Sequence, residues 1–598
     1  MADYRPIEDY GIIGDCRTAA LISREGSIDW LCLPNFHSSS VFARLLDAKV
    51  GGYFSVRPTV PYESRQSYVD GNSILKTDFH TPHGSVRLLD FMPITQSETQ
   101  KSRFLPLRQV VRIIEGLSGV LELEVDYQPR TYYASQKSRV KARSPHNHVL
   151  EGKGWQMQLL SERPLSHSES GAYGRLSISE GERVTISLGY DEDGPAVYPA
   201  VGQEALDLLR ETIEFWRSWL EVCSYDGPYQ GSVKRSALAL KLMEFAPSGA
   251  IIAAPTTSLP EKIGGSLNWD YRFCWLRDAA FTLEALQGIG FRQEAQAFLD
   301  WLLHSTRVTH PQLSVVYDIY GKDRLPPQEL DHLEGYRQSG PVRIGNRASQ
   351  QYQLDVYGEV LDGLFRTNPQ KCQGSRDVRN LVSGAADYVS EHWPEPDNGI
   401  WEMEQKGQFT HSKALCWLAL DRAVNLMQET GASRKRIKKW QEARDRVSRV
   451  VLEQGYSPKA RAFTQKLGQQ ELDASLLPLP IHGLIDPYDS RMLSTTKAVR
   501  DRLVVNGLVY RYDQGEGQLP DEGAFLICNF WLAHCLALQG DLDSAHQAFQ
   551  AGLKCANHLG LMSEEAHPYT LEALGNFPQG LTHIGLINAV LAIQQAET

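Results

Sequence analysis

The sequence has 598 residues, of which 42% are hydrophobic and 22% are charged, and its formal net charge is 61 − 72 = −11. These are ordinary values for a globular protein, so long disordered tails are not expected, and a chain of this length can bury a large core and shape a deep pocket. A mildly acidic surface argues against a nucleic acid or an anionic membrane as a partner, because both require clustered basic residues.

The N-terminal residues contain no basic region followed by an apolar run, and no stretch approaches about 20 uninterrupted apolar residues. The sequence therefore predicts neither a secretory signal nor a membrane span. The nine cysteines are scattered, with no C-x-x-C pair, and several stand inside apolar runs. This pattern is typical of reduced core thiols and predicts a cytoplasmic protein, the alternative being an exported protein with some disulfides.

The first third of the chain shows short strands separated by turns. Residues 18–33 read as two strands about the turn Arg24-Glu25-Gly26. Further strands are expected at residues 52–56, 73–79, 86–91, 107–114, 120–125, 175–178 and 184–188. Repeated short strands with turn signals favour an antiparallel sandwich.

The periodicity changes near residue 203. Apolar residues at helical spacing predict a connecting helix over 203–223, and Ser375 is a good N-cap for another helix. Further helices are expected at residues 231–244, 278–289, 348–366, 413–426, 438–453, 525–538, 542–556 and 581–595. The basic run at residues 434–439 is interpreted as the solvated start of a surface helix, since Trp440, Ala443 and Val447 follow at helical spacing. The alternative, an anion-binding patch, has no accompanying aromatic or glycine-rich residues. The chain is thus predicted to be a β-rich domain followed by a large all-α domain.

Three loops between the expected helices are dense in Trp, Arg and carboxylates. The first, N-W-D-Y-R-F-C-W-L-R-D, spans residues 268–278. Aromatic rings stack on the C–H faces of a sugar, while Arg277 and Asp278 together donate to and accept from its hydroxyls. The alternative is a buried Arg–Asp pair that holds the start of a helix.

The second loop, D-N-G-I-W-E at residues 397–402, places Glu402 directly after Trp401. An apolar neighbour desolvates a carboxylate and raises its pKa, as a general acid requires near neutral pH. The alternative is a surface glutamate in a loop.

The third loop, L-M-S-E-E at residues 561–565, is followed by G-N-F-P-Q at 575–579. Two adjacent glutamates point in different directions, so at most one of them is expected to face a pocket. A base that activates water should stay ionised in a polar, hydrated site. The alternative for Ser563-Glu564-Glu565 is the start of a helix, where acidic residues are favourable.

Together, in this order and spacing, the three loops resemble the glucoamylase-type family of inverting glycoside hydrolases, glycoside hydrolase family 15. The opening I-E-D-Y-G-I-I-G-D (7–15) and G-S-I-D-W-L-C-L-P (26–34) look like the N-terminal domain of bacterial trehalase-like members. Similar stretches follow at residues 247–261 (P-S-G-A-I-I-A-A-P-T-T-S-L-P-E), 345–348 (G-N-R-A) and 353–359 (Q-L-D-V-Y-G-E).

The resemblance covers nearly the whole chain and implies an N-terminal antiparallel super-β-sandwich, a linker helix and a catalytic (α/α)6 barrel. On this basis the expected domains are residues 1–202, 203–228 and 229–598. The resemblance also implies roles. Glu402 matches the family's general acid and Glu564 its general base. Arg277 and Asp278 match the pair that grips the terminal glucose, with Trp275, Trp401 and Tyr271 as further substrate-binding residues. Glu404 stands where many bacterial members have a basic residue.

The implied activity is exo-acting hydrolysis of a small α-glucoside with inversion, releasing β-glucose, and the trehalase-like N-terminal domain favours α,α-trehalose. Maltooligosaccharides and isomaltose are alternatives as substrates. A disaccharide phosphorylase and a non-catalytic carbohydrate-binding protein are alternatives of another class. We expect no cofactor, with a structural calcium ion left open, and no nucleic-acid or membrane partner, with a homo-oligomer left open.

Overall fold

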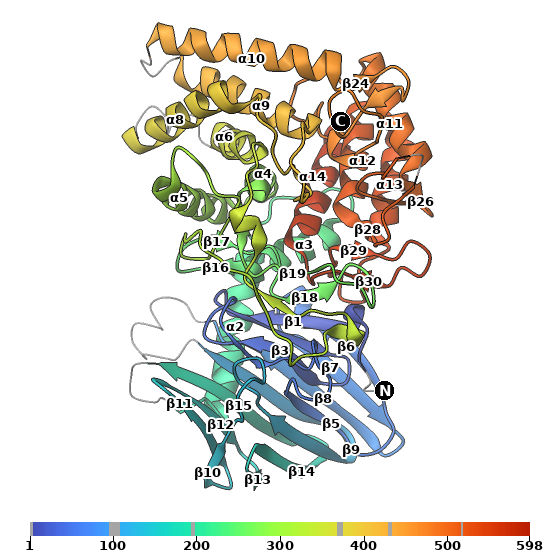
Figure 1. Ribbon diagram of the computed structural model, residues 1–598. Coiled ribbons are helices and arrows are strands. Elements are labelled where there is room, and N and C mark those ends of the chain that lie inside the picture. Colours follow the sequence, from blue (N-terminus) through green and yellow to red (C-terminus); the bar gives the residue numbers. More distant parts are fainter. Residues whose placement is uncertain (1–3, 95–107, 193–197, 368–374, 429–432, 516–517) are drawn as a thin grey trace.

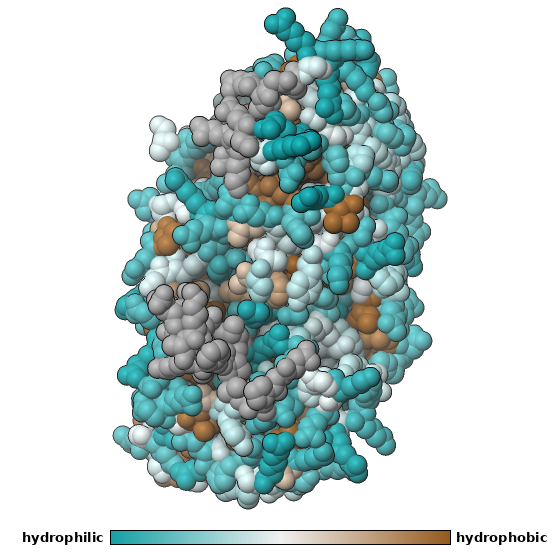
Figure 2. Space-filling model, turned by 90° about the vertical axis from the view of Figure 1, so that its left-hand side faces the viewer, coloured by the Kyte–Doolittle hydropathy of each residue, from teal (hydrophilic) through white to brown (hydrophobic). Residues whose placement is uncertain are grey.

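The computed structural model describes residues 4–94, 108–192, 198–367, 375–428, 433–515 and 518–598. Figure 1 shows a β-domain from the N-terminal part of the chain at one end of an elongated molecule and a helical domain at the other. The face shown in Figure 2 is mostly hydrophilic, with hydrophobic residues scattered over it in small groups.

The β-domain is one large antiparallel sheet folded on itself. Its central path runs β1-β2-β3-β5-β9-β15-β12-β11-β10, and the remaining strands pair along its edges. The strands are β1 Tyr10–Gly14, β2 Ala19–Ser23, β3 Ser27–Cys32, β4 Ser40–Phe42, β5 Tyr53–Pro58, β6 Glu63–Tyr68, β7 Leu75–Thr81, β8 Gly84–Phe91, β9 Gln109–Gln128, β10 Val140–Ser144, β11 Asn147–Gly152, β12 Trp155–Ser161, β13 Ser166–Ser168, β14 Gly171–Ser179 and β15 Arg183–Glu192.

The long strand β9 connects the two halves of this sheet. Its first half pairs with β8 and β15, and its second half pairs with β5 and β14. The sequence predicted two separate strands, 107–114 and 120–125, about a turn; residue 107 lies outside the described residues, and the rest is one strand. The glycines that read as a turn let neighbouring backbones approach closely instead, since a Cβ on Gly116 would collide with the carbonyl oxygen of Ser179.

Helix α2 (Gln203–Leu220) joins the two domains and confirms the predicted connecting helix. Ala205 and Leu208 at its start pack against the sheet in one small core. Near its end, the ring of Trp219 stacks on Phe291 with centroids 4.1 Å apart, and its Nε1 donates to Glu294 on α5 (Arg292–Thr309) at 2.7 Å. The start of α2 therefore packs against the sheet, and its end packs against the helical domain.

The helical domain has an inner and an outer layer of helices (Figure 1). The inner helices, buried over most of their residues, are α3 Gln230–Met243, α4 Ala279–Gly288, α6 Asp355–Thr367, α9 Thr410–Met427, α12 Leu526–Leu538 and α14 Gly580–Glu597. The outer ones are α5, α8 Arg376–His392, α10 Arg434–Gln454, α11 Ser490–Arg502 and α13 Leu542–Leu553. Six inner helices with five outer ones in the described part of the chain fit the predicted (α/α)6 barrel.

Most of the predicted helices are present with small shifts at their ends. Ser375 caps α8, since its side chain accepts from the N–H of Val378, and the basic run begins α10 as predicted. The helix predicted over 348–366 is wrong at its start: a short 3-10 turn, η5 (Arg347–Gln350), precedes α6, which begins at Asp355. The predictions also omitted α5 and α11. The predicted domain boundaries stay predictions.

No helix in the described part of the chain combines the length and the apolarity that crossing a membrane requires. The eight cysteines within the described ranges are free thiols, and most of them are buried. The cytoplasmic location stays a prediction.

Candidate active site

A cavity of about 510 Å³ opens in the helical domain, and its walls come from the loops that lead into inner helices. Tyr271 and Arg277 precede α4, Gln351 precedes α6, and Glu402 precedes α9. The full lining is Glu261, Leu267, Trp269, Tyr271, Arg277, Asn346, Arg347, Ala348, Gln351, Ile400, Trp401, Glu402, Met403, Glu404, Gln405, Lys466, Arg511, Tyr512, Glu522, Phe525 and Leu581. The cavity thus lies at the N-terminal end of several inner helices, where unpaired N–H groups favour negative charge.

Glu402 lies on a strained turn. Its φ is +57°, a left-handed conformation that costs a non-glycine residue roughly 1–3 kcal/mol. Hydrogen bonds hold the turn closed: the N–H of Glu402 donates to the Gly399 carbonyl at 3.1 Å, and Gln351 Nε2 donates to the Glu402 carbonyl at 2.9 Å. Asn398 Nδ2 also donates to the Met403 carbonyl, at 2.8 Å. These hydrogen bonds therefore hold the turn in its strained conformation. Strained residues held in this way are common at functional sites.

Two donors fix the carboxyl of Glu402. Its Oε1 accepts from Trp275 Nε1 at 2.7 Å and from Arg277 Nη1 at 3.2 Å. The adjacent Trp401 does not contribute its N–H, because its Nε1 donates to Asp473 at 2.9 Å. The predicted apolar surroundings of Glu402 are therefore wrong: a cation and an indole N–H face the carboxylate, and the apolar ring next to it in sequence lines the cavity instead.

The predicted pair Arg277–Asp278 is present at the start of α4. Arg277 Nε donates to Asp278 Oδ1 at 3.3 Å, and its Nη1 donates to the Ile400 carbonyl at 2.6 Å. Burial is the largest influence on the pKa of the Asp278 carboxyl, which is raised even though Arg277 opposes the shift. Arg277 itself thus connects the loop before α4 to the turn that carries Glu402.

Glu564 stands just behind the cavity wall, with 1% of its surface exposed. Its backbone N–H donates to the Asn576 carbonyl at 3.2 Å, and its Oε2 accepts from the Asn576 N–H at 3.2 Å. Its Oε1 has no hydrogen-bond partner among the described residues. Burial raises the pKa of Glu564 to about 8, the nearby Glu261 adds to that rise, and Tyr271 opposes it. This carboxyl is therefore buried among polar groups, and the hydration predicted for it stays a prediction.

Tyr271 connects the two glutamates. Its ring packs edge-on against Trp275, with centroids 5.2 Å apart, and Trp275 in turn donates to Glu402. Burial raises the pKa of the Tyr271 phenol, and the charges of Glu564, Glu261 and Glu402 raise it further. Tyr271 therefore lies beside Glu564 and packs against Trp275, the residue that holds Glu402, which stands 162 positions before Glu564 in the sequence.

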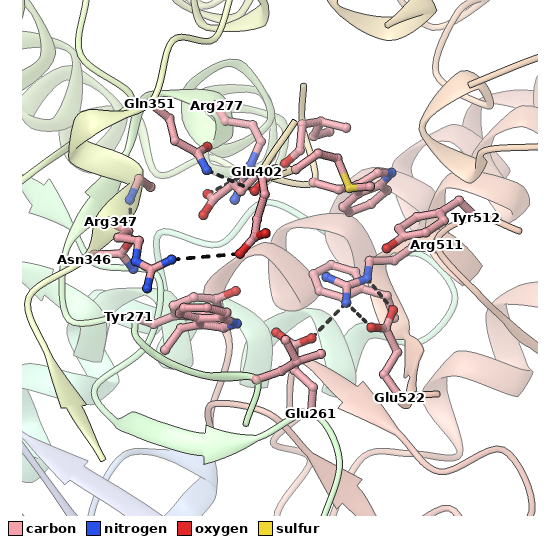
Figure 3. A pocket seen from close by; sticks show the side chains of 18 of the residues that line it. Glu261, Tyr271, Arg277, Asn346, Arg347, Gln351, Glu402, Arg511, Tyr512 and Glu522 are labelled. Carbon is pink, nitrogen blue, oxygen red and sulfur yellow. Dashed lines mark hydrogen bonds and ion pairs between the residues drawn. The ribbon is translucent and has the colours of Figure 1, made fainter. Parts of the chain in front are cut away.

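The opposite wall carries an acidic cluster around Arg511 that the sequence did not predict (Figure 3). Arg511 Nη2 lies 2.8 Å from Glu261 Oε2 and 2.7 Å from Glu522 Oε2, and Arg511 Nε donates to Glu522 Oε1 at 2.8 Å. The guanidinium also lies over the rings of Trp401 and Phe525, at 5.7 and 5.4 Å from the centroids. In Figure 3 this wall faces Glu402 and Arg277 across the cavity.

The structure brings the predicted site residues to one place, where some line the cavity and others lie behind its wall. Tyr271, Arg277, Trp401 and Glu402 line the cavity. The side chains of Trp275, Asp278 and Glu564 lie directly behind them. Sequence reasoning missed Arg511, Glu522 and Gln351, none of which stands in a distinctive motif. Trp269 stands in the first loop but was not singled out, and Glu261 was noted only as the end of a family-like stretch. No group of three or more metal-ligating side chains with suitable geometry occurs in the described parts of the chain.

Comparison with known proteins assigns the chain to a family. Residues 227–591 match the family "Glycosyl hydrolases family 15", and residues 2–161 match "Trehalase-like, N-terminal". The chain belongs to glycosyl hydrolases family 15. This family 15 member is a glycoside hydrolase, and the expected family and enzyme class are confirmed.

Relatives match this glycosidase over nearly its whole length. It is 35% identical to a trehalase from Thermoplasma volcanium, over 99% of this chain and 94% of the relative. It is also 35% identical to a trehalase from Mycolicibacterium smegmatis, over 99% and 92%. A crystal structure of a bacterial glucoamylase complexed with acarbose superposes with a TM-score of 0.75 at 15% identity, covering 99% of this chain and 95% of that one. The last likeness confirms the fold.

Proposed function

We propose that this glycosidase hydrolyses α,α-trehalose with inversion, using Glu402 as the general acid and Glu564 as the general base. The observation that carries the proposal is that Glu402 lines the cavity and that Glu564 lies beside Tyr271, which lines the same cavity. The choice of trehalose rests on the relatives named trehalase, which match both domains. The cavity has the size of a small-molecule pocket, which favours removal of a terminal glucose from a short substrate.

The reaction proposed is a single displacement. Glu402 donates its proton to the glycosidic oxygen while Glu564 removes a proton from the water that attacks the anomeric carbon from the opposite face. An inverting pair needs carboxyls roughly 6.5–9.5 Å apart, to leave room for that water. Because burial raises the pKa of Glu564, this carboxylate is a strong proton acceptor whenever it is ionised. No metal or organic cofactor takes part.

The remaining predicted residues bind the glucose unit. Arg277 holds Glu402 in the free enzyme, and its remaining N–H groups suit the hydroxyls of a bound sugar. Trp401 lines the cavity, with its ring fixed by the hydrogen bond to Asp473, so it offers an apolar face for the C–H side of the ring. Asp278 orients Arg277, and Trp275 orients Glu402.

The test measures glucose release from trehalose, maltose, maltotriose, isomaltose and starch, with NMR of the fresh products. Inversion of trehalose gives equal amounts of α- and β-glucose at first, whereas retention gives α-glucose alone. Hydrolysis of trehalose at a rate independent of phosphate separates this reaction from phosphorolysis. Faster release from maltose or isomaltose would replace trehalose as the substrate, and retained activity in Glu564→Gln would remove Glu564 as the base.

A further inference from the structure

The acidic cluster around Arg511 is continuous with the proposed base. Glu522 contacts Arg511 with both oxygens, at 2.7 and 2.8 Å, and so uses most of the cation's capacity. Glu261 Oε2 shares the same Nη2 at 2.8 Å, and Glu565 Oε1 lies 3.5 Å from it. Glu261, Glu522 and Glu565 thus surround one guanidinium, whose charge also acts on Glu564, and all four carboxyls are buried or nearly so.

These carboxyls cannot all be ionised at once, because four negative charges and one positive charge would leave a net charge of −3 in a region with little water. Burial raises the pKa of Glu261, Glu564 and Glu565. The charge of Glu261 raises the pKa of Glu564 and Glu565 further, and the charge of Glu522 raises that of Glu261. Glu565 is an obvious holder of one proton, since neither of its oxygens has a hydrogen-bond partner in the described structure. Of the remaining carboxyls, Glu261 and Glu564 have to be compared for their ease of ionisation.

Glu261 is expected to ionise more easily than Glu564. It lines the cavity and is paired with Arg511, while Oε1 of Glu564 has no partner. Their backbones are also linked, since the carbonyl of Pro260 accepts from the N–H of Gly575, and Gly575 packs on the Glu564 carboxyl. The charge of Arg511 therefore stabilises the ionised forms of Glu522 and Glu261 more than that of Glu564.

We propose that Glu261 is a positioning residue whose negative charge, held at the cavity wall by Arg511, opposes ionisation of Glu564 and so sets the pH above which the base can act. The inference rests on the proposed role of Glu564 as the base. Because repulsion between neighbouring carboxylates is mutual, the ionisation of each carboxyl depends on the state of the other, and the two titrate as a pair.

Other groups face this pair from every element packed against it. Tyr271 and Trp269 approach from β19 (Asn268–Asp270) and the residue after it, and Glu522 approaches from the segment before β28 (Ala524–Phe525). The Asn576 N–H faces Glu564, and Glu402 acts on Tyr271 from across the cavity. Of these, Tyr271 favours the charged form of Glu564, whereas Glu522 raises the pKa of Glu261. Glu261 contacts the cation at 2.8 Å and raises the pKa of the base, whereas Glu565 lies 3.5 Å from the cation.

The experiment isolates the ionisation of Glu564 by removing the need for a general acid. Fluoride leaves without protonation, so hydrolysis of α-glucosyl fluoride by Glu402→Gln depends on the base alone. In that background, Glu261→Gln keeps the length of the side chain and an acceptor for Arg511 but removes the charge. The pH midpoint of kcat/KM is expected to fall by about half a pH unit or more, since a repelling charge has gone. A midpoint that stays in place or rises would overturn the proposal, and a purely structural role for Glu261 would lower kcat without moving it.

Asp521→Asn is the matched control. Asp521 is the neighbour of Glu522 in sequence, but its side chain is 87% exposed and pairs with Lys262, so solvent screens its charge. The midpoint should not move in this variant. A midpoint that falls equally in both variants would show a general effect of net charge and would also overturn the proposal.

A second measurement does not require any substitution at residue 261. The acid–base titration of the wild-type enzyme minus that of Glu564→Gln should show two phases, one for the lost carboxyl and one for the earlier ionisation of Glu261. A single one-proton step would mean that the carboxyls are independent and would overturn the inference. The proposed function fails separately, if Glu564→Gln hydrolyses trehalose as fast as the wild type.

Discussion

The indole N–H of Trp275 donates to Oε1 of Glu402 at 2.7 Å, although the two residues come from loops before different inner helices. Trp275 is buried and precedes α4, and Glu402 precedes α9 on its left-handed turn. The sequence assigned Trp275 to the lining of the sugar site. The structure gives it a different task, because its N–H fixes the side chain of the proposed acid from behind.

Trp275→Phe should therefore slow the acid-dependent step. The change keeps the aromatic packing against Tyr271 but removes a hydrogen bond to a charged group, which contributes roughly 1.5–3 kcal/mol. We expect kcat for trehalose to fall about 10- to 100-fold, with a much smaller loss for α-glucosyl fluoride, which needs no acid. Trp417→Phe, on the outer side of α9, should leave both rates near the wild type. Equal losses for the two substrates would indicate disturbed binding instead.

The pH dependence of the base follows from its burial. The pKa of Glu564 is raised to about 8, first by burial and then by Glu261, so the carboxylate form accumulates only as pH rises through that value. Hydrolysis of α-glucosyl fluoride by Glu402→Gln should accordingly increase with pH, with a midpoint of kcat/KM near 8. Tyr271 lowers this pKa, so adding Tyr271→Phe should move the midpoint upward. A downward move would contradict the placement of the phenol beside Glu564.

The N-terminal domain supports the same loop through Arg272. This buried guanidinium contacts Asp270 at 2.6 Å and donates to the Tyr133 hydroxyl at 2.7 Å and to the Ser38 carbonyl at 3.0 Å. Tyr133→Phe would take the shortest hydrogen bond from Arg272 Nη1 and leave the Ser38 carbonyl and the weakly accepting Cys32 Sγ, which should cost about 0.5–1.5 kcal/mol of unfolding free energy. Urea denaturation should show this loss. Tyr173→Phe, at a half-exposed tyrosine of β14, should change stability by less than about 0.5 kcal/mol.

Particular residues show which features of the fold and of the site the sequence could predict. Ser375 and the start of α10 were predictable, because a cap and an amphipathic stripe are local properties of the chain. The three loops were predictable as one site only through their resemblance to a family. The surroundings of the two glutamates were not, because Arg277 reaches Glu402 from 125 residues away and Arg511 reaches Glu261 from 250 residues away. Propensity and spacing carry no information about such long-range pairs, and so the electrostatics inferred from sequence neighbours alone were wrong.

Gly575 tests how closely the carboxyl of Glu564 is packed. Its φ is +70°, and a Cβ there would collide with Glu564 Oε2 and lie 2.7 Å from Glu564 Cβ. Gly575→Ala should therefore displace the base as well as strain the backbone, and we expect kcat to fall by more than about 10-fold, since small displacements of a catalytic group are costly. Gly468→Ala is the matched control, because Gly468 has a φ of +73° and nothing within 4 Å of the added Cβ. That variant should lose only about 1 kcal/mol of stability from the left-handed conformation and keep its kcat. Equal activity in both variants would show that the backbone around residue 575 yields without moving Glu564.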